Sequence, residues 1–289
     1  MATEAYAASF GFEWNRHRQT QLDSRTGRSD SRDTFAARMG LGRSDLDGRL
    51  VLDAGTGVGR FAEVAAGLGG RVVAVDLSRA VDLAAENLGD QALVAQADVF
   101  RLPFADGTFD VVFSIGVLHH TPDPSAGLAA LARVVRPGGT VAVSVYERAA
   151  WYRMADLYRV LTTRLDRRTL YRLSRGLARL HAIHRLPVVG RAVRFLVPVS
   201  GHPVYDWRVL DTFNWYAPRY QSKHTFAEVV GWFRALGFEA IETRRPSVAV
   251  RGRRPMNAAG ESAAPGLSRI AGETTPVGET APPVPASPA

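Results

Sequence analysis

The sequence contains no cysteine, and Lys223 is the single lysine among 36 basic residues. The absence of cysteine excludes disulfides, thiolate nucleophiles and cysteine-ligated zinc. No apolar run approaches the roughly 18 residues that a membrane-spanning helix needs. Residues 1–14 have neither the basic start nor the long apolar core of a signal peptide. We therefore expect a cytoplasmic protein without a transmembrane segment.

The chain of 289 residues is 46% hydrophobic and 22% charged, which is ordinary for a globular protein. This length suits one good-sized domain with an elaboration. The net charge of +8 is unevenly placed, because residues 148–194 hold twelve arginines and only two aspartates. The basicity therefore belongs to one segment, although a GC-rich coding sequence explains the preference for arginine equally well.

Short apolar runs alternate with helical patterns between residues 49 and 146, and we interpret the runs as strands. They are LVLDA (50–54), RVVAVD (71–76), ALVAQAD (92–98), DVVFSIG (110–116) and TVAVSVY (140–146). Their high content of Val, Ala, Leu and Ile is typical of strands buried on both faces. Pro137, Gly138 and Gly139 predict a turn that starts the last strand. The alternation predicts an α/β, doubly wound, mostly parallel sheet over this cofactor-binding core.

Four further segments follow from the composition. Residues 1–48 are a polar N-terminal cap segment with aromatic residues at Phe10, Phe12 and Trp14. Residues 147–222 are an arginine-rich helical insertion. Residues 223–251 return to the α/β pattern, with a capping box that opens a helix and two strands at 238–243 and 247–250. Residues 252–289 carry seven prolines and no aromatic residue, which predicts a disordered tail.

The insertion contains two amphipathic stretches. One apolar stripe at helical spacing consists of Trp151, Met154, Leu157/Tyr158, Leu161 and Leu165. A second consists of Leu170, Leu173, Leu177 and Leu180, and Arg168, Arg172, Arg175 and Arg179 lie on the face opposite to it. We predict that the apolar stripes face the core, that the arginines point away from it, and that the insertion covers the substrate.

A glycine-rich loop, VLDAGTGVGR (51–60), lies between the first strand and a helix, where backbone often approaches a ligand. The dinucleotide fingerprint places its third glycine three residues after the second. Here Gly59 follows Gly57 by two residues, and Asp53 precedes the glycines. A carboxylate at that position repels a pyrophosphate and suits a cation, so a cationic amino acid attached to adenosine fits better than NAD.

Three acids stand at the ends of successive predicted strands: Asp53, Asp76 and Asp98. Asp76 follows Gly59 by 17 residues, near the roughly 20 expected for an acid that holds ribose hydroxyls. Asp98 could accept the adenine amino group while the Val99 backbone donates to the ring. Each acid alone is explained as well by helix capping. The three together favour a nucleoside ligand.

These segments in order resemble the motifs of class I S-adenosylmethionine-dependent methyltransferases. The resemblance rests on VLDAGTGVGR, VVAVDLS, ADVFRLPFADGTFDVVFSIGVLHHTPDP and RVVRPGGTVAVSVY. It covers residues 49–146 strongly and 223–251 more loosely. It implies a seven-stranded sheet whose last strand is antiparallel, with the cofactor S-adenosyl-L-methionine at the carboxyl ends of the strands.

The resemblance also implies where the cofactor lies. Asp53, Gly55 and Gly57 would meet its methionine part, Asp76 its ribose, and Asp98 its adenine. The full set of implied cofactor-binding residues is Asp53, Gly55, Thr56, Gly57, Gly59, Asp76, Leu77, Asp98, Val99, Ser114, Ile115 and His119. Thr56 stands where many members have cysteine. No metal is expected in the site.

The residues after the fourth predicted strand bear on the methyl acceptor. Members of this family that methylate base amino groups usually carry an Asn/Asp-Pro-Pro-aromatic motif there, and this chain has SIGVLHH (114–120). Small-molecule members often show an LHH-type sequence, so a small acceptor, such as one of specialised metabolism, is favoured. A loop-shaping role explains the histidines at least as well as proton transfer. The candidate catalytic residues are His120, Tyr216 and His224.

The arginines of the insertion leave several partners open. They could meet an anionic or lipid-like acceptor or an anionic membrane surface. Nucleic acid is disfavoured, and a solvated helix face needs no partner at all. The alternative functions are an RNA or protein methyltransferase that uses the basic insertion, and a non-catalytic interaction module on the same fold. The glycine spacing and Asp53 disfavour a nicotinamide-dependent oxidoreductase.

Overall fold

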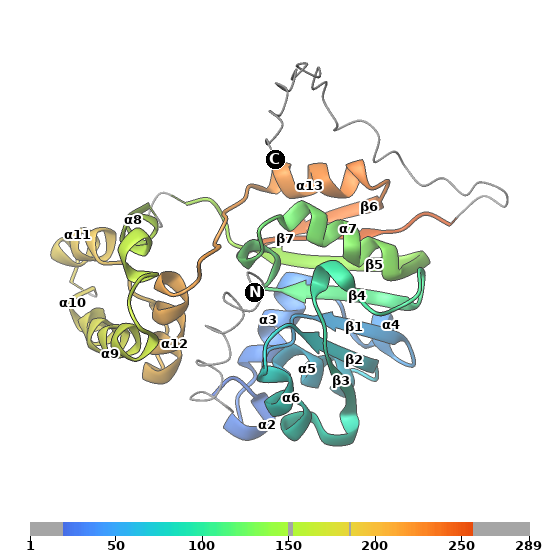
Figure 1. The fold of residues 1–289 in the computed structure, drawn as a ribbon, viewed down its shortest axis with the longest axis horizontal. Coiled ribbons are helices and arrows are strands. Elements are labelled where there is room, and N and C mark those ends of the chain that lie inside the picture. Colours follow the sequence, from blue (N-terminus) through green and yellow to red (C-terminus); the bar gives the residue numbers. More distant parts are fainter. Residues whose placement is uncertain (1–19, 150–152, 185, 257–289) are drawn as a thin grey trace, which may run out of the picture. The chain divides into compact units, whose positions relative to one another are not determined.

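The computed structural model describes residues 20–149, 153–184 and 186–256. Seven strands form one sheet in the order β3-β2-β1-β4-β5-β7-β6 (Figure 1). They are β1 (Leu50–Ala54), β2 (Arg71–Asp76), β3 (Ala92–Gln96), β4 (Phe109–Ile115), β5 (Val135–Val145), β6 (Glu239–Arg244) and β7 (Val248–Arg253). The first five strands run parallel to one another, and β7 runs antiparallel between β5 and β6. The doubly wound, mostly parallel sheet is confirmed.

Helices pack on both faces of this sheet. One face is covered by α3 (Asp30–Met39), α5 (Arg60–Gly67) and α6 (Ala80–Leu88), and the other by α7 (Pro124–Val134) and α13 (Phe226–Ala235). Successive strand residues alternate between the two layers. Val51 packs with the first set of helices and Leu52 with the second. Because both faces are covered, the central strands must be apolar throughout, which explains the patterns read from the sequence.

Short helices and turns complete this part of the chain: α2 (Asp23–Thr26), α4 (Arg43–Leu46), η1 (Gly89–Gln91), η2 (Val99–Arg101) and η3 (Leu118–His120). The predicted capping box is confirmed at the start of α13. Thr225 Oγ1 accepts a hydrogen bond from the Glu228 amide at 3.3 Å, and the Thr225 amide donates to Glu228 Oε2 at 2.6 Å.

Two details differ from the sequence interpretation. β3 is an edge strand, and Leu93 is 74% exposed rather than buried on both sides. Pro137, Gly138 and Gly139 do not separate a helix from a strand. They lie inside β5, where Gly138 takes a left-handed φ of +73° and the register with β4 shifts. A glycine bulge within a strand and a turn before it have the same composition.

The insertion forms helices α8 (Arg153–Thr162), α9 (Arg167–Leu177), α10 (His181–His184), α11 (Val189–Leu196) and α12 (Tyr205–Tyr216), with a 3-10 turn, η5 (Ala178–Leu180). They lie beside the end of the sheet where β5 finishes (Figure 1). α8 and α9 pack on α12 around a small core of Ala155, Leu170, Phe213 and Tyr216. The insertion therefore has apolar packing of its own.

This packing corrects the predicted orientation of the apolar stripes. Leu170 and Leu177 belong to the apolar cluster that includes Phe213 and Tyr216 of α12. Leu161 is 65% exposed and Leu173 is 44% exposed. The sequence patterns predicted no helix over residues 205–216, where the structure has α12. The apolar stripes were expected to pack on the core formed by the sheet and its helices. They pack on α12 instead, so part of each stripe faces solvent.

Some expectations concern residues outside the described ranges. These are Phe10, Phe12 and Trp14 of the N-terminal cap segment, Trp151 of the first stripe, and the tail from residue 257 onward. Among the described residues, no helix combines the length and apolarity needed to cross a membrane.

The predicted start of the tail at residue 252 is too early. β7 continues to Arg253, and Gly252 pairs with Val141 of β5. The Arg254 guanidinium donates to the carbonyl oxygens of Val135 at 2.6 Å and Ala132 at 3.1 Å. Residues 252 and 253 thus belong to β7, and Arg254 anchors the end of α7.

Two truncations test this boundary. A chain ending at residue 256 keeps every contact just described, whereas one ending at residue 251 loses the last β7 pairs and the Arg254 hydrogen bonds. Hydrogen bonds from a charged donor contribute about 1.5–3 kcal/mol, and 1 kcal/mol shifts the melting temperature of a domain this size by about 2–4 °C. We expect the shorter chain to melt about 5–10 °C below the longer one in calorimetry. Equal melting temperatures would return the boundary to residue 251.

Candidate functional site

A cavity of about 360 Å³ opens at the carboxyl ends of the parallel strands, beside the insertion. Its volume lies within the roughly 300–1,000 Å³ typical of small-molecule sites. One part is lined by residues that follow β1, β2 and β3: Gly55, Thr56, Gly57, Val58, Asp76, Leu77, Ser78, Ala97, Asp98 and Val99. The other part is lined by Gln21, Arg38, Arg60, Phe61, Ile115, Gly116, Val117, His120, Thr121, Tyr146, Asp211, Asn214 and Trp215. The sheet domain and α12 therefore share one cavity.

The glycine-rich loop forms the floor of the cavity, and its backbone lies close to the side chain of Val117. Gly55 has a φ of +91°, and a Cβ added there would lie 2.2 Å from Cγ2 of Val117. The loop is fixed to the second strand, because the amides of Gly55 and Thr56 donate to the Val75 carbonyl at 2.7 and 2.9 Å. Only glycine fits at position 55, for both conformational and steric reasons.

Asp53 lies beneath this loop and does not line the cavity. It is buried in the centre of the sheet, paired in register with Ala74 and Phe113. Its Oδ2 atom is buried without a hydrogen-bond partner in the described part of the chain. Burial raises the pKa of this carboxyl to about 7. A cation bound above the loop would stabilise the ionised form.

Asp76 and Asp98 both line the cavity. Asp76 holds the loop, since its Oδ2 accepts a hydrogen bond from the Gly57 amide at 2.9 Å and its Oδ1 accepts from the Ser78 amide at 2.8 Å. Asp98 caps η2 by accepting from the Phe100 amide at 3.0 Å. The capping role considered for Asp98 is therefore present. An ionised carboxylate has about four lone-pair positions, so both acids retain acceptor capacity toward the cavity.

Cationic and aromatic groups occupy the opposite side. The Arg60 guanidinium lies over the rings of Phe61 at 4.5 Å and Trp207 at 4.8 Å, and burial lowers its pKa to about 10, with the Arg38 charge acting in the same direction. Burial also raises the pKa of Asp211, whose Oδ2 accepts from Ser200 Oγ at 2.9 Å. Two guanidinium groups and one carboxyl thus line this part of the cavity.

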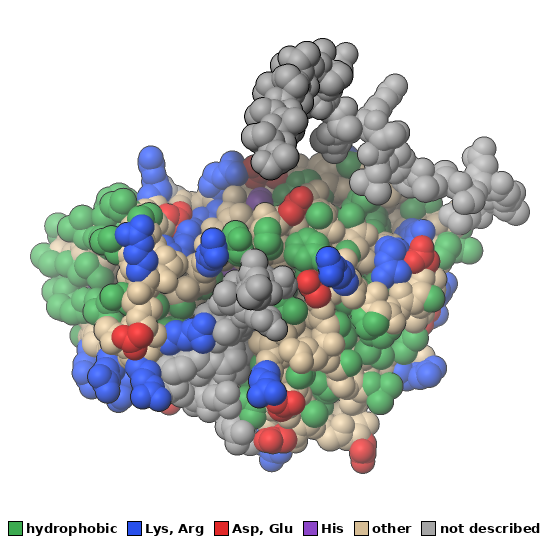
Figure 2. Space-filling view, in the orientation of Figure 1, with side chains coloured by type: hydrophobic (Ala, Val, Ile, Leu, Met, Phe, Trp, Pro, Cys, Tyr) green, Lys and Arg blue, Asp and Glu red, His purple; other side chains and the backbone are tan. Residues whose placement is uncertain are grey.

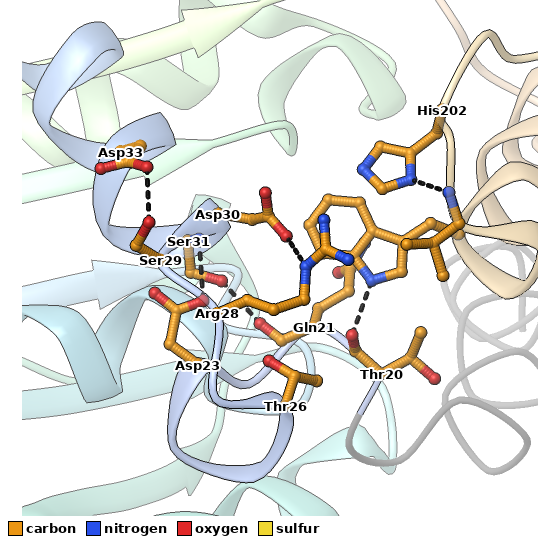
Figure 3. A network of polar contacts seen from close by, with 12 residues as sticks. Thr20, Gln21, Asp23, Thr26, Arg28, Ser29, Asp30, Ser31, Asp33 and His202 are labelled. Carbon is orange, nitrogen blue, oxygen red and sulfur yellow. Dashed lines mark hydrogen bonds and ion pairs between the residues drawn. The ribbon is translucent and has the colours of Figure 1, made fainter.

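The N-terminal segment is held against the insertion by a polar network (Figure 3). The indole Nε1 of Trp207 donates to the Thr20 carbonyl at 2.6 Å. Ser31 Oγ donates to the Gln21 carbonyl at 2.6 Å, and Asp23 accepts from the Ser31 amide at 3.0 Å. Gln21 is thereby placed on the cavity wall, so residues from three distant parts of the chain meet there.

His119 and His120 have different surroundings. The His119 ring is fully buried, stacks on Tyr146 with centroids 3.9 Å apart, and does not line the cavity. Burial holds its pKa well below the usual value. His120 does line the cavity, and its Nδ1 lies 3.0 Å from the Tyr220 carbonyl. Because a carbonyl only accepts, Nδ1 carries the proton. Burial lowers the pKa of His120 to about 4, so the ring is neutral and Nε2 bears a lone pair.

Four other predicted site residues lie outside the cavity lining. The Tyr216 hydroxyl donates to the Pro198 carbonyl at 2.8 Å within the insertion, and His224 Nε2 lies 2.8 Å from Ser222 Oγ. Gly59 donates to the Thr56 carbonyl at 3.0 Å, and buried Ser114 Oγ donates to the Ala54 carbonyl at 2.7 Å. All four residues help to hold the segments around the cavity, and none of them lines it.

Several lining residues were not identified from the sequence. Asp211, Asn214 and Trp215 have the i, i+3, i+4 spacing of one helix face, which was a usable signal once residues 205–216 were recognised as a helix. Arg60 directly follows the glycine loop. Gln21 and Arg38 carry no local signal, because only the packing of α3 and the N-terminal segment brings them to the cavity.

Comparison with known proteins identifies relatives of the segment that builds this site. Residues 52–143 match the family described as "Methyltransferase domain". The chain is similar to ubiquinone biosynthesis O-methyltransferase of Thiobacillus denitrificans, with 41% identity over 115 residues, covering 37% of this chain and 49% of the relative. The corresponding enzyme of Aromatoleum aromaticum is 38% identical over 109 residues, covering 36% and 46%. The chain thus spans about half the length of these curated relatives.

The similarity to solved structures extends over more of the chain. A chain in the complex between the Haloferax volcanii Trm112 methyltransferase activator and a methyltransferase superposes with a TM-score of 0.52 at 17% identity. It covers 86% of this chain and 98% of the other. At this level of identity the match establishes the shared fold.

Proposed function

We propose that this chain, whose residues 52–143 belong to the methyltransferase domain family on a class I fold, transfers a methyl group from S-adenosylmethionine to a small molecule. The observation that carries the proposal is the convergence of the glycine loop, Asp76, Asp98 and His120 on one cavity of about 360 Å³. That cavity has one part suited to a nucleoside and a second part lined by groups of different chemistry.

The residues present fit this cofactor. The buried carboxyl of Asp53 would provide negative charge beneath the loop for the cationic methionine part. The missing Cβ of Gly55 allows backbone to approach the ligand. Asp76 would hold the ribose hydroxyls, and Asp98 with the Val99 amide would hold the adenine. When bound, the cofactor supplies a methyl group already activated on a sulfonium.

His120 is the residue that we assign to the acceptor. Its Nδ1–H is directed to the Tyr220 carbonyl, so Nε2 is the ring nitrogen that carries the lone pair, and we assign the acceptor hydroxyl to that nitrogen. As the oxygen–carbon bond forms, the hydroxyl proton becomes strongly acidic, so a weak base is sufficient to remove it. The proton passes to Nε2 while the methyl group passes to oxygen. Tyr216 and His224 act in packing in this proposal, because their polar atoms have partners within the insertion and its connection to α13.

The acceptor half of the cavity favours an anionic small molecule. Arg38 and Arg60 both line it. Burial lowers the pKa of Arg60, the Arg38 charge adds to this effect, and the carboxylates of Asp211, Asp23 and Asp30 oppose it. An anionic group on the acceptor would offset this repulsion and form a bidentate contact with a guanidinium. The Arg60 guanidinium lies over the Trp207 ring, and this contact holds the guanidinium in place.

Transfer of a labelled methyl group tests the function directly. The full chain would be incubated with labelled S-adenosylmethionine and a panel of phenols, each with and without a ring carboxylate, and in parallel with RNA and with protein. We expect label in the small hydroxyl compounds and at least about tenfold more in the carboxylated ones, since hydrogen bonds between charged groups are worth about 1.5–3 kcal/mol. Label in RNA or protein alone would overturn the small-molecule assignment.

Asp76→Ala tests the cofactor site. The change removes a charged acceptor from the ribose position and from the Gly57 amide. With about 1.5–3 kcal/mol for such hydrogen bonds, affinity for S-adenosylmethionine should fall by roughly tenfold to a hundredfold in calorimetry. Asp82→Ala, an exposed acid on nearby α6, is the matched control and should bind like the parent chain. Unchanged affinity in folded Asp76→Ala would remove this residue from the site.

His120→Asn tests the proposed base. The asparagine amide can still donate to the Tyr220 carbonyl, but the Nε2 lone pair is lost. General bases contribute about 10²–10⁴ in rate, so turnover of a hydroxyl acceptor should fall by at least about a hundredfold while cofactor affinity stays within about twofold. Tyr216→Phe, which loses only a packing hydrogen bond, should retain most of its turnover. Equal losses in both variants would show that His120 has a structural role.

A further inference from the structure

The surface of the insertion exposes large apolar side chains that neither the fold nor the proposed site uses. On α8, Leu157, Val160 and Leu161 are all exposed, and near α11 Val188 is 78% exposed. The two helices are joined because the Tyr158 hydroxyl donates to the Leu196 carbonyl at 2.9 Å. The C-terminal end of α11 therefore lies against α8.

The α11 region adds further members to this set. The docking surface, as we use the term, comprises Leu157, Val160, Leu161, Leu165, Ile183, Leu186, Val188, Val189, Phe195 and Leu196. Hydrophobic side chains gather at the end of the molecule where α10 and α11 lie, with Lys and Arg side chains along its lower margin (Figures 1 and 2). Exposed apolar surface of this extent marks an interaction site.

Arginines accompany the apolar residues. Arg168, Arg172, Arg175 and Arg179 are exposed on α9 and the turn after it, and Arg191 is exposed on α11. In the described ranges none of these five forms an ion pair with a carboxylate. Asp156 and Asp166 are the two acids between residues 153 and 196, and Asp166 caps α9 by accepting from two of its amides. The exposed arginines of the insertion therefore outnumber its acids and give this part of the surface a positive charge.

We propose that this surface docks on an anionic phospholipid bilayer. Guanidinium groups bind lipid phosphates, each basic residue near such a surface contributing about 1 kcal/mol. The leucines, valines and Phe195 enter the boundary between headgroups and acyl chains, as on other interfacial helices. The chemistry favours a bilayer over RNA, because RNA phosphates would engage the arginines and leave the apolar residues in water. Docking does not depend on methyl transfer.

Vesicle cosedimentation of the full chain tests the proposal. We expect binding to vesicles of phosphatidylcholine with phosphatidylglycerol, and at least tenfold weaker binding to phosphatidylcholine alone or at high salt. Leu161→Glu with Val188→Glu should weaken binding at least tenfold. Leu93→Glu is the matched control, since Leu93 is equally exposed but lies on β3. Arg168→Glu with Arg172→Glu should also weaken binding, whereas Arg25→Glu with Arg71→Glu, exposed on the sheet domain, should not.

The affinity for S-adenosylmethionine, measured on the same samples, shows that each variant is folded and separates the two proposals. Retained cofactor binding without vesicle binding would overturn docking and leave the proposed function standing. Equal losses in the Leu93 control and the docking variants would also overturn docking. Binding to single-stranded RNA that competes with vesicles and survives Leu161→Glu with Val188→Glu would show instead that the arginines serve a nucleic acid.

Discussion

The site depends on the reversal of strand order between β1 and β4. β1 pairs with β2 on one side and with β4 on the other, so the chain leaves these two strands toward opposite faces of the sheet. After β1 it enters α5 on one face, and after β4 it passes through η3 to α7 on the other. The two connections diverge and open a crevice at the carboxyl ends of the strands. Gly55 and Val117 close its floor, because their contact leaves no room for a side chain at position 55.

Burying Asp53 beneath that crevice has an electrostatic consequence. The folded protein holds this carboxyl at a pKa of about 7, above its ordinary value of 3.8, so the folded state binds the proton more tightly than the unfolded state does. The resulting stabilisation is complete below about pH 4 and is lost as the pH rises through 7. At neutral pH the ligand-free protein therefore keeps a destabilised, partly ionised carboxylate. A cationic ligand above the loop, such as the proposed cofactor, would relieve this cost, and the sheet would then contribute to the binding free energy.

The sequence was sufficient where local chemistry determines the structure. Strand periodicity gave the sheet, and the spacing of Gly55, Gly57, Asp76 and Asp98 gave half of the cavity, because each of these residues stands at a strand end. The other half could not be found in this way. Arg38 reaches the cavity from α3 through tertiary packing alone. Tyr216 and His224 looked suitable by residue type, but their polar atoms are satisfied away from the lining.

α12, which the sequence patterns did not predict, has one side toward the cavity and another toward the other helices of the insertion. Along α12, Asp211, Asn214 and Trp215 fall on one side at about 100° per residue, and Phe213 and Tyr216 fall on the other. The first side lines the cavity, while the second packs under α8 and α9. Because α12 supplies this packing, the outer apolar residues of α8 are not needed for the fold. α12 separates the site from a surface that is free to evolve toward a partner.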